Sequence, residues 1–173
     1  TTLLALTDQD PTSIIGGIVP NYGSNAHAGD GPLLIAEADE SDGTLVKFKA
    51  NLGVITNLEL DHTDHYSNIN ELINTIQKFA IGCKKVLANY DCSLLLKKIK
   101  PSAWWSIKTI KEVDFAAIPT ALNGRQTIAN VYEKEKLVGE INLPISGEHN
   151  LSNAIAAIAA CRLNGVEFEK INA

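Results

Sequence analysis

Three short apolar runs of the same design constrain the fold of this chain more than any other feature. They lie at residues 33–36, 53–58 and 85–89, and polar or acidic residues follow each of them. Continuous apolar runs of this length are typical of strands that are buried on both faces of a parallel sheet. The three runs therefore predict strands of one α/β sheet.

A helix is predicted between the second and third runs. Over residues 69–81 the apolar side chains recur at spacings of three and four, which is the pattern of an amphipathic helix. Ser67 or Asn68 is placed to cap its first turn. Strand, helix and strand in this order form a right-handed βαβ unit. The fold class is therefore α/β, with a mostly parallel sheet flanked by helices.

The chain after Pro101 has a different pattern. Short segments with alternating or β-branched residues are separated by turn signals, namely Asn123-Gly124 and the polar residues 133–136. This pattern predicts a small antiparallel sheet appended to the α/β core. Its expected segments are residues 104–107, 114–118, 127–132 and 137–143.

The last predicted element is an alanine-rich helix over residues 150–163, which ends near Asn164-Gly165. Of the adjacent pair Trp104 and Trp105, one is expected in the core.

Length and charge limit the classes of function. The 173 residues fit a single domain with a continuous core, over residues 1–173. A net charge of −5 gives no electrostatic footprint for nucleic acid or an anionic membrane, and no apolar run is long enough to span a bilayer. Three cysteines without a CxxC pair indicate free thiols in a reducing, cytoplasmic compartment. Since the chain lacks methionine altogether, we expect it to be part of a longer protein.

An acidic segment follows the first apolar run. Four carboxylates fall within the six residues 37–42, beginning with Glu37. Ligands of open α/β sheets bind at the carboxyl ends of the strands, and carboxylates are oxygen ligands that suit Mg²⁺. By itself the segment fits a metal site and a solvated acidic loop equally well.

A second polar segment follows the next run. It contains Asn57 and the pairs Asp61-His62 and Asp64-His65. Two Asp-His pairs at the end of a strand favour a metal or phosphate site over a surface loop. No cysteine joins them and the spacing is not that of a zinc site, so magnesium handled together with a phosphate is the better interpretation.

The third segment opens the alanine-rich helix and contains His149, Asn150 and Asn153. The two asparagines are three residues apart, on one face of the first turn. An amide offers both a donor and an acceptor, so the pair suits the edge of a heterocycle. The same residues would also serve as helix caps, and the two functions are compatible.

Together, these three segments resemble the Mur ligase family. The matching stretches are Glu37-Ala-Asp-Glu-Ser-Asp42, Thr56-Asn57 with Asp61-His62, and Gly147-Glu-His-Asn150 with Asn153-Ala154, in the order of the family. Gly16-Gly17 and Asn25-Ala26 with Gly29 resemble its upstream, substrate-side segment. The resemblance covers essentially the whole chain, although residues 101–143 carry no motif. It implies the central, ATP-binding domain of such a ligase, with a fold like that of P-loop NTPases.

The resemblance also implies a chemistry and its residues. Members of this family use ATP and Mg²⁺ to join a carboxylate to an amine through an acyl phosphate. Carried over by position, Glu37 and His62 are the catalytic residues and bind the metal ions. Asn150 and Asn153, with His149 nearby, would bind the adenine, and Asn57 would lie on the phosphate or substrate side. Asp39 and Asp61 would orient the metal ligands.

Within the family, the acidic segment is most similar to that of the members that add L-alanine to UDP-N-acetylmuramate. The murein-peptide recycling members, which use a tripeptide instead, typically have tyrosine where this chain has Ser41, and they are the runner-up. The family's Gly-x-His-Gly-Lys-Thr phosphate loop does not occur in these residues, nor do its N-terminal UDP-binding and C-terminal domains. We therefore expect these 173 residues alone to be inactive. A non-catalytic nucleotide-binding module and a zinc hydrolase built on His62 and His65 are weaker alternatives.

Overall fold

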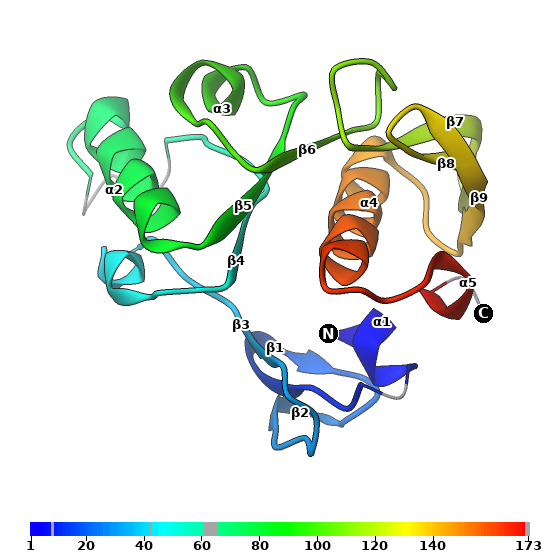
Figure 1. Cartoon of the computed structure of the whole chain (residues 1–173), viewed down its shortest axis with the longest axis horizontal. Helices are drawn as coiled ribbons and strands as arrows, with labels where there is room; N and C mark the ends of the chain where they lie inside the picture. The colour runs from blue at the N-terminus through cyan, green and yellow to red at the C-terminus, as the bar shows by residue number, and fades with distance from the viewer. Residues whose placement is uncertain (8, 42, 61–65, 172–173) are drawn as a thin grey trace. The chain divides into compact units, whose positions relative to one another are not determined.

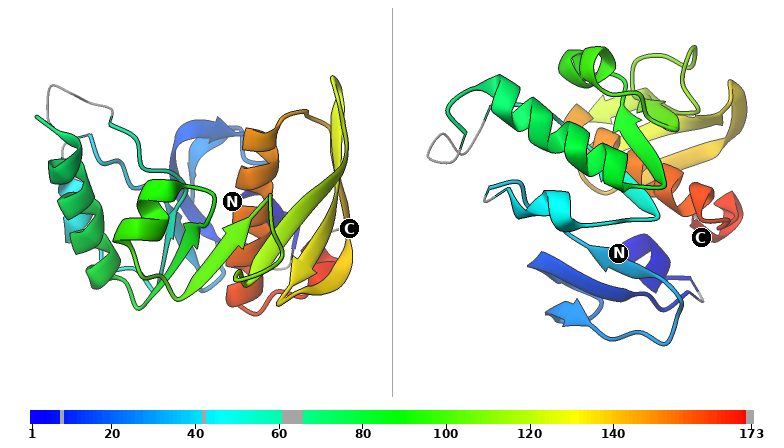
Figure 2. Two further views of the ribbon diagram at one scale, coloured as in Figure 1. Left: turned by 90° about the horizontal axis from the view of Figure 1, so that it is seen from above. Right: turned by 60° about the vertical axis from the view of Figure 1, so that its left-hand side comes forward.

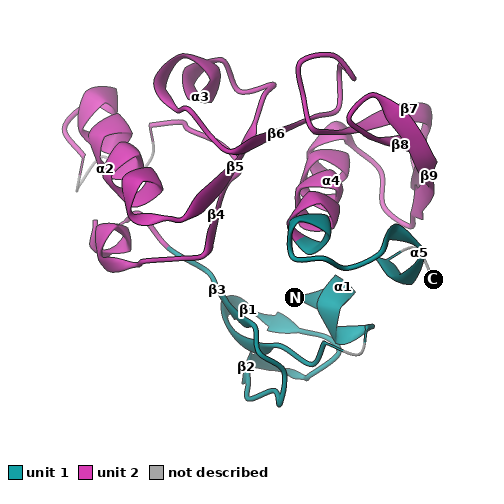
Figure 3. Ribbon diagram, viewed as in Figure 1, with its two compact units in different colours: residues 1–38, 161–173 teal, residues 39–160 magenta. Residues whose placement is uncertain are grey.

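The computed structural model describes residues 1–7, 9–41, 43–60 and 66–171. The chain forms two compact units, which Figure 3 shows in different colours. Unit 1 consists of residues 1–38 and 161–173, and unit 2 consists of residues 39–160. None of the helices in the described part of the chain has the length and apolar character needed to cross a lipid bilayer.

Unit 1 is built on a small three-stranded sheet. Its elements are α1 (Thr2–Ala5), β1 (Thr12–Val19), β2 (Ser24–His27), β3 (Leu34–Ala36) and α5 (Phe168–Ile171). The strand order is β2-β1-β3, with β1 antiparallel to β2 and parallel to β3.

The run at residues 33–36 was predicted to be a strand of the main sheet, and this prediction is wrong. It forms β3, whose partner is β1 of the small sheet, and 65% of the Leu34 side chain is exposed. An apolar run specifies a strand but not the sheet that the strand joins, because pairing depends on the rest of the topology.

Unit 2 contains one six-stranded sheet with helices on its two faces (Figures 1 and 2). The sheet order is β4-β5-β6-β7-β8-β9. Its elements are η1 (Thr44–Lys47), β4 (Leu52–Ile55), α2 (Ile69–Gly82), β5 (Lys85–Asn89), α3 (Ser93–Lys98), β6 (Ala103–Ser106), β7 (Phe115–Asn123), β8 (Gln126–Glu133), β9 (Lys136–Leu143) and α4 (Glu148–Leu163). Helix α4 continues beyond unit 2, since its residues from Cys161 on belong to unit 1. The predicted α/β class is confirmed.

Helix α2 forms as the sequence predicts. The side chain of its N-cap, Asn68, accepts hydrogen bonds from the backbone N–H groups of Asn70 and Glu71, which satisfies donors that have no partner within the helix. The apolar side chains at spacings of three and four are buried; they are Leu72, Ile73, Ile76 and Phe79.

The contact between α2 and β4 depends on Gly53. A Cβ atom at this position would lie 2.6 Å from Cys83 Sγ and 3.1 Å from the Phe79 ring. Only a residue without a side chain lets the helix approach the strand this closely.

The predicted antiparallel segments form strands, but they are not a separate sheet. Strand β7 is parallel to β6 and antiparallel to β8, so the antiparallel part continues the parallel sheet. Strand β6 was predicted in the antiparallel part and is instead parallel to both of its neighbours. Both predicted turns are present, and Lys134 and Glu135 have φ angles of 49° and 65°, as a tight hairpin turn requires.

Trp105 is the tryptophan in the core, as expected for one of the pair. It is fully buried, and its indole N–H donates to Ser152 Oγ on α4 over 3.2 Å. Trp104 is partly exposed and packs edge-on against Tyr90. Alternate residues of β6 thus face opposite sides of the sheet, as the strand geometry dictates.

Candidate functional site

Glu37 lies directly after β3 in unit 1. Its backbone N–H donates to the carbonyl of Ile14 over 2.9 Å, which extends the pairing with β1 by one residue. Its carboxylate Oε2 accepts a 2.6 Å hydrogen bond from the backbone N–H of Gly16. A Cβ atom at Gly16 would lie 3.1 Å from this oxygen, so the close approach of Glu37 favours glycine at this position. The sheet therefore fixes the position of the predicted metal-binding carboxylate.

Residues 39–41 of the acidic segment lie in unit 2, where their hydrogen bonds form a tight loop. Asp39 Oδ1 accepts a 2.7 Å hydrogen bond from the N–H of Ser41, and the carbonyl of Glu40 accepts one of 2.9 Å from Gly43. The hydroxyl of Tyr66 donates a second bond, of 2.6 Å, to the same carbonyl. Tyr66 is 3% exposed, so this loop is tied to the core of unit 2.

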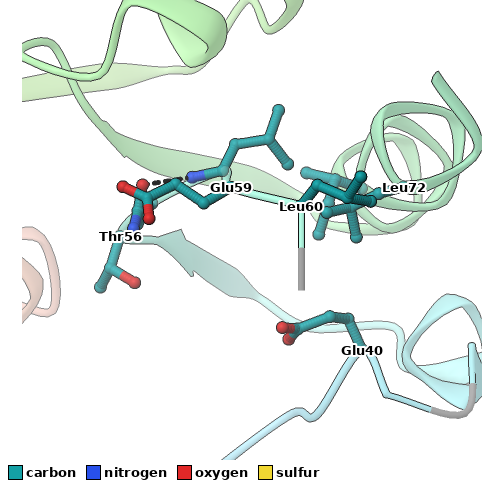
Figure 4. A pocket seen from close by; sticks show the side chains of 8 residues that line it. Glu40, Thr56, Glu59, Leu60 and Leu72 are labelled. Carbon is teal, nitrogen blue, oxygen red and sulfur yellow. Dashed lines mark hydrogen bonds between the residues drawn. The ribbon is translucent and has the colours of Figure 1, made fainter. Parts of the chain in front are cut away.

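A pocket of about 280 Å³ lies beside this loop, at the carboxyl end of β4. Figure 4 shows Glu40 on one side, with Thr56, Glu59 and Leu60 of the segment after β4 on the other. Leu72 and Ile76 of α2 also line it, together with Asn57 and Leu58. The pocket thus combines two carboxylates, one hydroxyl and one amide with an apolar wall.

Asn57 is the predicted site residue that this pocket contains. Its Oδ1 accepts a 2.7 Å hydrogen bond from the N–H of Leu58 and lies 3.9 Å from Cys92 Sγ. These contacts orient the amide, and an amide nitrogen can only donate. Asn57 is therefore suited to an anionic or carbonyl oxygen in the pocket.

His62, the second predicted metal ligand, lies outside the described residues, as do Asp61, Asp64 and His65. Its role remains a prediction. Within the described residues, no group of three or more histidine, cysteine, aspartate or glutamate side chains could hold a metal ion. The described oxygen donors are therefore Glu37 in unit 1 and Glu40, Glu59 and Thr56 at the pocket of unit 2.

The three residues predicted at the adenine lie in the first turns of α4. The side-chain N–H₂ of Asn150 donates to the carbonyl of Ser146 over 2.8 Å. That of Asn153 lies 3.1 Å from His149 Nε2, which must accept because an amide nitrogen only donates. The amide oxygens take no part in these two bonds. Such oxygens suit the exocyclic amino group of a purine.

Gly147 makes this start of the helix possible. Its φ of +115° is a conformation that side chains rarely adopt. The turn lets the carbonyl of Gly147 accept the first helical bond, from Leu151 over 3.1 Å. The predicted Gly147–Asn153 segment is thus a helix start with two oriented amides.

Unit 1 holds a hydrogen-bonded group that the sequence did not indicate. The Tyr22 and His27 rings are stacked, with centroids 3.8 Å apart. His27 Nε2 donates to Asp10 Oδ1 over 2.8 Å, and the N–H of Asp30 donates to Asp10 Oδ2 over 2.8 Å. The hydrogen bond from the Asp30 backbone, and then that from His27, lower the pKa of Asp10.

The segment predicted to be substrate-side falls in the same unit. Gly16 and Gly17 lie in β1, and Asn25 and Ala26 lie in β2. Gly29 leads towards β3, and a Cβ atom there would lie 2.1 Å from the carbonyl oxygen of Asp10.

Tyr66, Glu40 and Glu59 are site residues that the sequence reasoning missed. Glu40 and Glu59 were visible as carboxylates within the segments singled out, but only the fold shows that both line one pocket. No signal in the sequence assigns the Tyr66 hydroxyl to a carbonyl 26 residues away.

Comparison with known proteins gives one consistent result. The family model described as the Mur ligase middle domain matches residues 24–161. A protein from Prochlorococcus marinus (strain MIT 9313) named UDP-N-acetylmuramate–L-alanine ligase is 65% identical over 171 residues. That alignment covers 99% of this chain and 35% of the relative. A protein of the same name from Synechococcus sp. (strain CC9605) is 58% identical, with 99% and 36% covered. The chain thus spans about a third of the length of these curated relatives.

Solved structures share the fold. A UDP-N-acetylmuramate-alanine ligase from Thermotoga maritima superposes with a TM-score of 0.83 at 24% identity, over 98% of this chain and 39% of that one. The UDP-N-acetylmuramate:L-alanyl-γ-D-glutamyl-meso-diaminopimelate ligase from Neisseria meningitidis gives 0.82 at 22% identity, over 98% and 58%. The fold alone therefore fits both kinds of ligase equally well.

Proposed function

Because this chain belongs to the Mur ligase middle-domain family, we propose that it is the ATP-handling part of a ligase that joins L-alanine to UDP-N-acetylmuramate. The observation that carries the proposal is the 65% identity, over 99% of the chain, to a protein of that name. Since the chain spans about a third of that relative, the activity is proposed for the full-length protein, whose flanking domains would supply the remaining contacts.

The proposed reaction has two steps. A lactyl carboxylate oxygen of UDP-N-acetylmuramate attacks the γ-phosphorus of ATP, and ADP leaves, which produces an acyl phosphate. The amine of L-alanine then attacks the acyl carbon, inorganic phosphate leaves, and the amine loses a proton as the amide forms. Both steps bring anions together, so the protein must position the reactants and neutralise charge.

Each unit holds oxygen donors of the kind that binds Mg²⁺. In unit 1, Glu37 supplies a carboxylate held by a backbone N–H. In unit 2, the carboxylates of Glu40 and Glu59 and the Thr56 hydroxyl line the pocket. These are the hard oxygen donors that Mg²⁺ prefers. We propose that Glu37 holds one Mg²⁺ and that His62 helps to hold a second, and these ions when bound would neutralise the phosphate charges.

Asn150 and Asn153 are proposed to bind the adenine, with His149 beside them. The Ser146 carbonyl and His149 engage their amide nitrogens, so the amide oxygens would accept from the adenine amino group. Asn57 is proposed to donate to a phosphate or substrate oxygen in the pocket. Asp39, whose carboxylate already closes the acidic loop on Ser41, would hold that loop in shape.

The recycling reaction, with a tripeptide in place of L-alanine, is the alternative. The near-equal TM-scores show a fold shared by both kinds of ligase and do not distinguish the two reactions. The experiment supplies the full-length protein with UDP-N-acetylmuramate, ATP and Mg²⁺, and offers either L-alanine or L-Ala-γ-D-Glu-meso-diaminopimelate. Phosphate release that depends on L-alanine is the expected result. Turnover with the tripeptide alone would transfer the proposal to the recycling reaction, and turnover with neither would reject both.

A further inference from the structure

One end of the sheet in unit 2 gathers several segments that are far apart in the sequence. They are the loop before β4, the end of α2 with the loop before β5, and the end of α3 with the loop before β6. The N–H of Lys84 donates to the carbonyl of Ala50 over 2.9 Å, and Gln77 Nε2 donates to the carbonyl of Lys98 over 2.9 Å. Figure 1 shows η1 beside the end of α2. We call residues 46–50, 78–85 and 97–100 the basic edge.

The basic edge carries a concentrated positive charge. Five exposed lysines surround η1 and the end of α2; they are Lys47, Lys49, Lys78, Lys84 and Lys85. Three more, Lys97, Lys98 and Lys100, lie at the end of α3. These eight residues are more than half of the 15 lysines and arginines in a chain whose net charge is −5.

Acidic residues do not neutralise these lysines. The stretches 43–58, 72–90 and 92–111 contain no aspartate or glutamate. None of the eight lysines forms an ion pair with another residue of the described ranges. Favourable interaction with a helix dipole accounts for Lys97 and Lys98, which lie in the last turn of α3, but not for the lysines in the loops.

Exposed apolar side chains lie among these lysines. The Ile81 side chain, near the end of α2, is 85% exposed, and those of Phe48 and Val46 are 43% and 38% exposed. The backbone places Phe48 beside the end of α2, because a Cβ atom at Gly82 would lie 3.2 Å from the Phe48 carbonyl oxygen. Basic and apolar side chains therefore share one surface.

We propose that the basic edge docks on the surface of an anionic lipid bilayer. Lysines attract anionic headgroups from within about 10 Å, and projecting apolar side chains enter the boundary between headgroups and acyl chains. A nucleic acid would use the lysines but would gain little from Ile81. An acidic protein would need carboxylates matched to lysines on three separate segments, whereas a lipid surface offers diffuse negative charge.

This binding would leave the pocket accessible. The loop before β4 belongs to the basic edge, whereas the pocket residues Thr56–Leu60 follow the end of the same strand. The two features therefore lie at opposite ends of β4. The inference does not depend on the proposed ligase activity, and it can be tested without substrates.

The test is co-sedimentation of the full-length protein with vesicles. One set contains phosphatidylglycerol and phosphatidylcholine in equal parts, and the other contains phosphatidylcholine alone. We expect binding to the anionic vesicles only, and its loss at high salt. The paired variant Lys47→Glu with Lys49→Glu should lower the partition coefficient at least about tenfold. Phe48→Ser with Ile81→Ser should lower it by about tenfold as well.

A matched charge control is available at the other end of β6. Lys108→Glu with Lys111→Glu makes the same change in net charge at exposed positions outside the basic edge, and it should leave binding unchanged. An equal loss of vesicle binding in this control would show that the basic edge is not the binding surface. Failure of the unmodified protein to bind anionic vesicles would overturn the proposal. It would also be overturned if the protein bound a DNA duplex as tightly as the vesicles and the Phe48 and Ile81 changes had no effect, because the surface would then bind polyanions in general. Circular dichroism melts identify any variant that fails to fold.

Discussion

The hydroxyl of Tyr66 donates a 2.6 Å hydrogen bond to the backbone carbonyl of Glu40, whose side chain lines the pocket. The bond joins two segments that are 26 residues apart. It fixes one wall of the pocket relative to α2, which begins three residues after Tyr66.

Tyr66→Phe removes this bond and keeps the ring in the core. The Glu40 carbonyl retains the N–H of Gly43 as a donor, so we expect a loss of about 1 kcal/mol of stability. In ligation assays of the full-length protein we expect kcat/KM to fall by roughly tenfold, with a higher Mg²⁺ requirement, because a carboxylate of the pocket is less well positioned. Steady-state kinetics at varied Mg²⁺ measure both effects.

Tyr90→Phe is the matched control for this change. It removes a 2.7 Å bond between the Tyr90 hydroxyl and Glu112 Oε2, and neither residue lines the pocket at β4. An equal kinetic loss in this control would contradict a specific role for Tyr66.

Two substitutions of Glu37 separate its two proposed functions. Glu37→Gln keeps an oxygen that can accept from the N–H of Gly16 but removes the charge, so the melting temperature should change little while activity falls by at least about a hundredfold. Glu37→Ala should lose the same activity and, in addition, about 1 kcal/mol of stability. Thermal melts and ligation assays on the full-length protein distinguish them. An active Glu37→Gln variant would remove Glu37 from the metal site.

Gly31→Ala should destabilise unit 1 severely. The new Cβ atom would lie 1.8 Å from the carbonyl oxygen of Gln9, and both groups belong to backbone that cannot move aside locally. We expect a loss of about 3 kcal/mol, measured by urea denaturation. Gly17→Ala is the control, because its Cβ would meet nothing within 4 Å. Similar losses in the two variants would show that the close approach at Gly31 is unimportant.

The pKa of Asp10 gives a prediction in the acid range. Hydrogen bonds from the Asp30 backbone and from His27 lower this pKa in the folded chain, so they stabilise the fold while the carboxylate is ionised. That stability is present at neutral pH and disappears as the pH falls through the lowered pKa. His27→Gln should raise the pKa part of the way, since the bond from Asp30 is retained. A carbon-13 NMR titration of the Asp10 carboxyl measures it, and an unchanged pKa would contradict the role of His27.

The sequence predicted those elements whose signals are local. The cap and periodicity of α2 lie within consecutive residues, so they could be read without the fold. The sheet to which β3 belongs could not be predicted, because it depends on pairing with β1, more than a dozen residues earlier. The continuity of the sheet across β7 was missed for the same reason.

For the candidate site, the sequence indicated which residues to consider but not the contacts that they make. Asn57, Asn150 and Asn153 were found from their positions after a strand or at a helix start. The bonds that orient their amides depend on side-chain conformations.

The basic edge could not be predicted from composition. The net charge of −5 is a sum over the whole chain, so it does not show that eight lysines lie close together. Only the topology brings helix ends and strand-entry loops to the same end of a sheet.

The change from parallel to antiparallel pairing at β7 has a consequence for how unit 2 folds. Strands β7, β8 and β9 are joined by short turns, so their pairing closes only small loops and can form within microseconds. Strands β4, β5 and β6 pair only after intervening segments, including α2 and α3, have crossed over. The C-terminal half of the sheet can therefore act as a preformed template, with the edge of β7 accepting β6 as the first of the slower strands. During synthesis β4–β6 leave the ribosome before this template, so the pairing of β6 with the edge of β7 must follow the synthesis of β7.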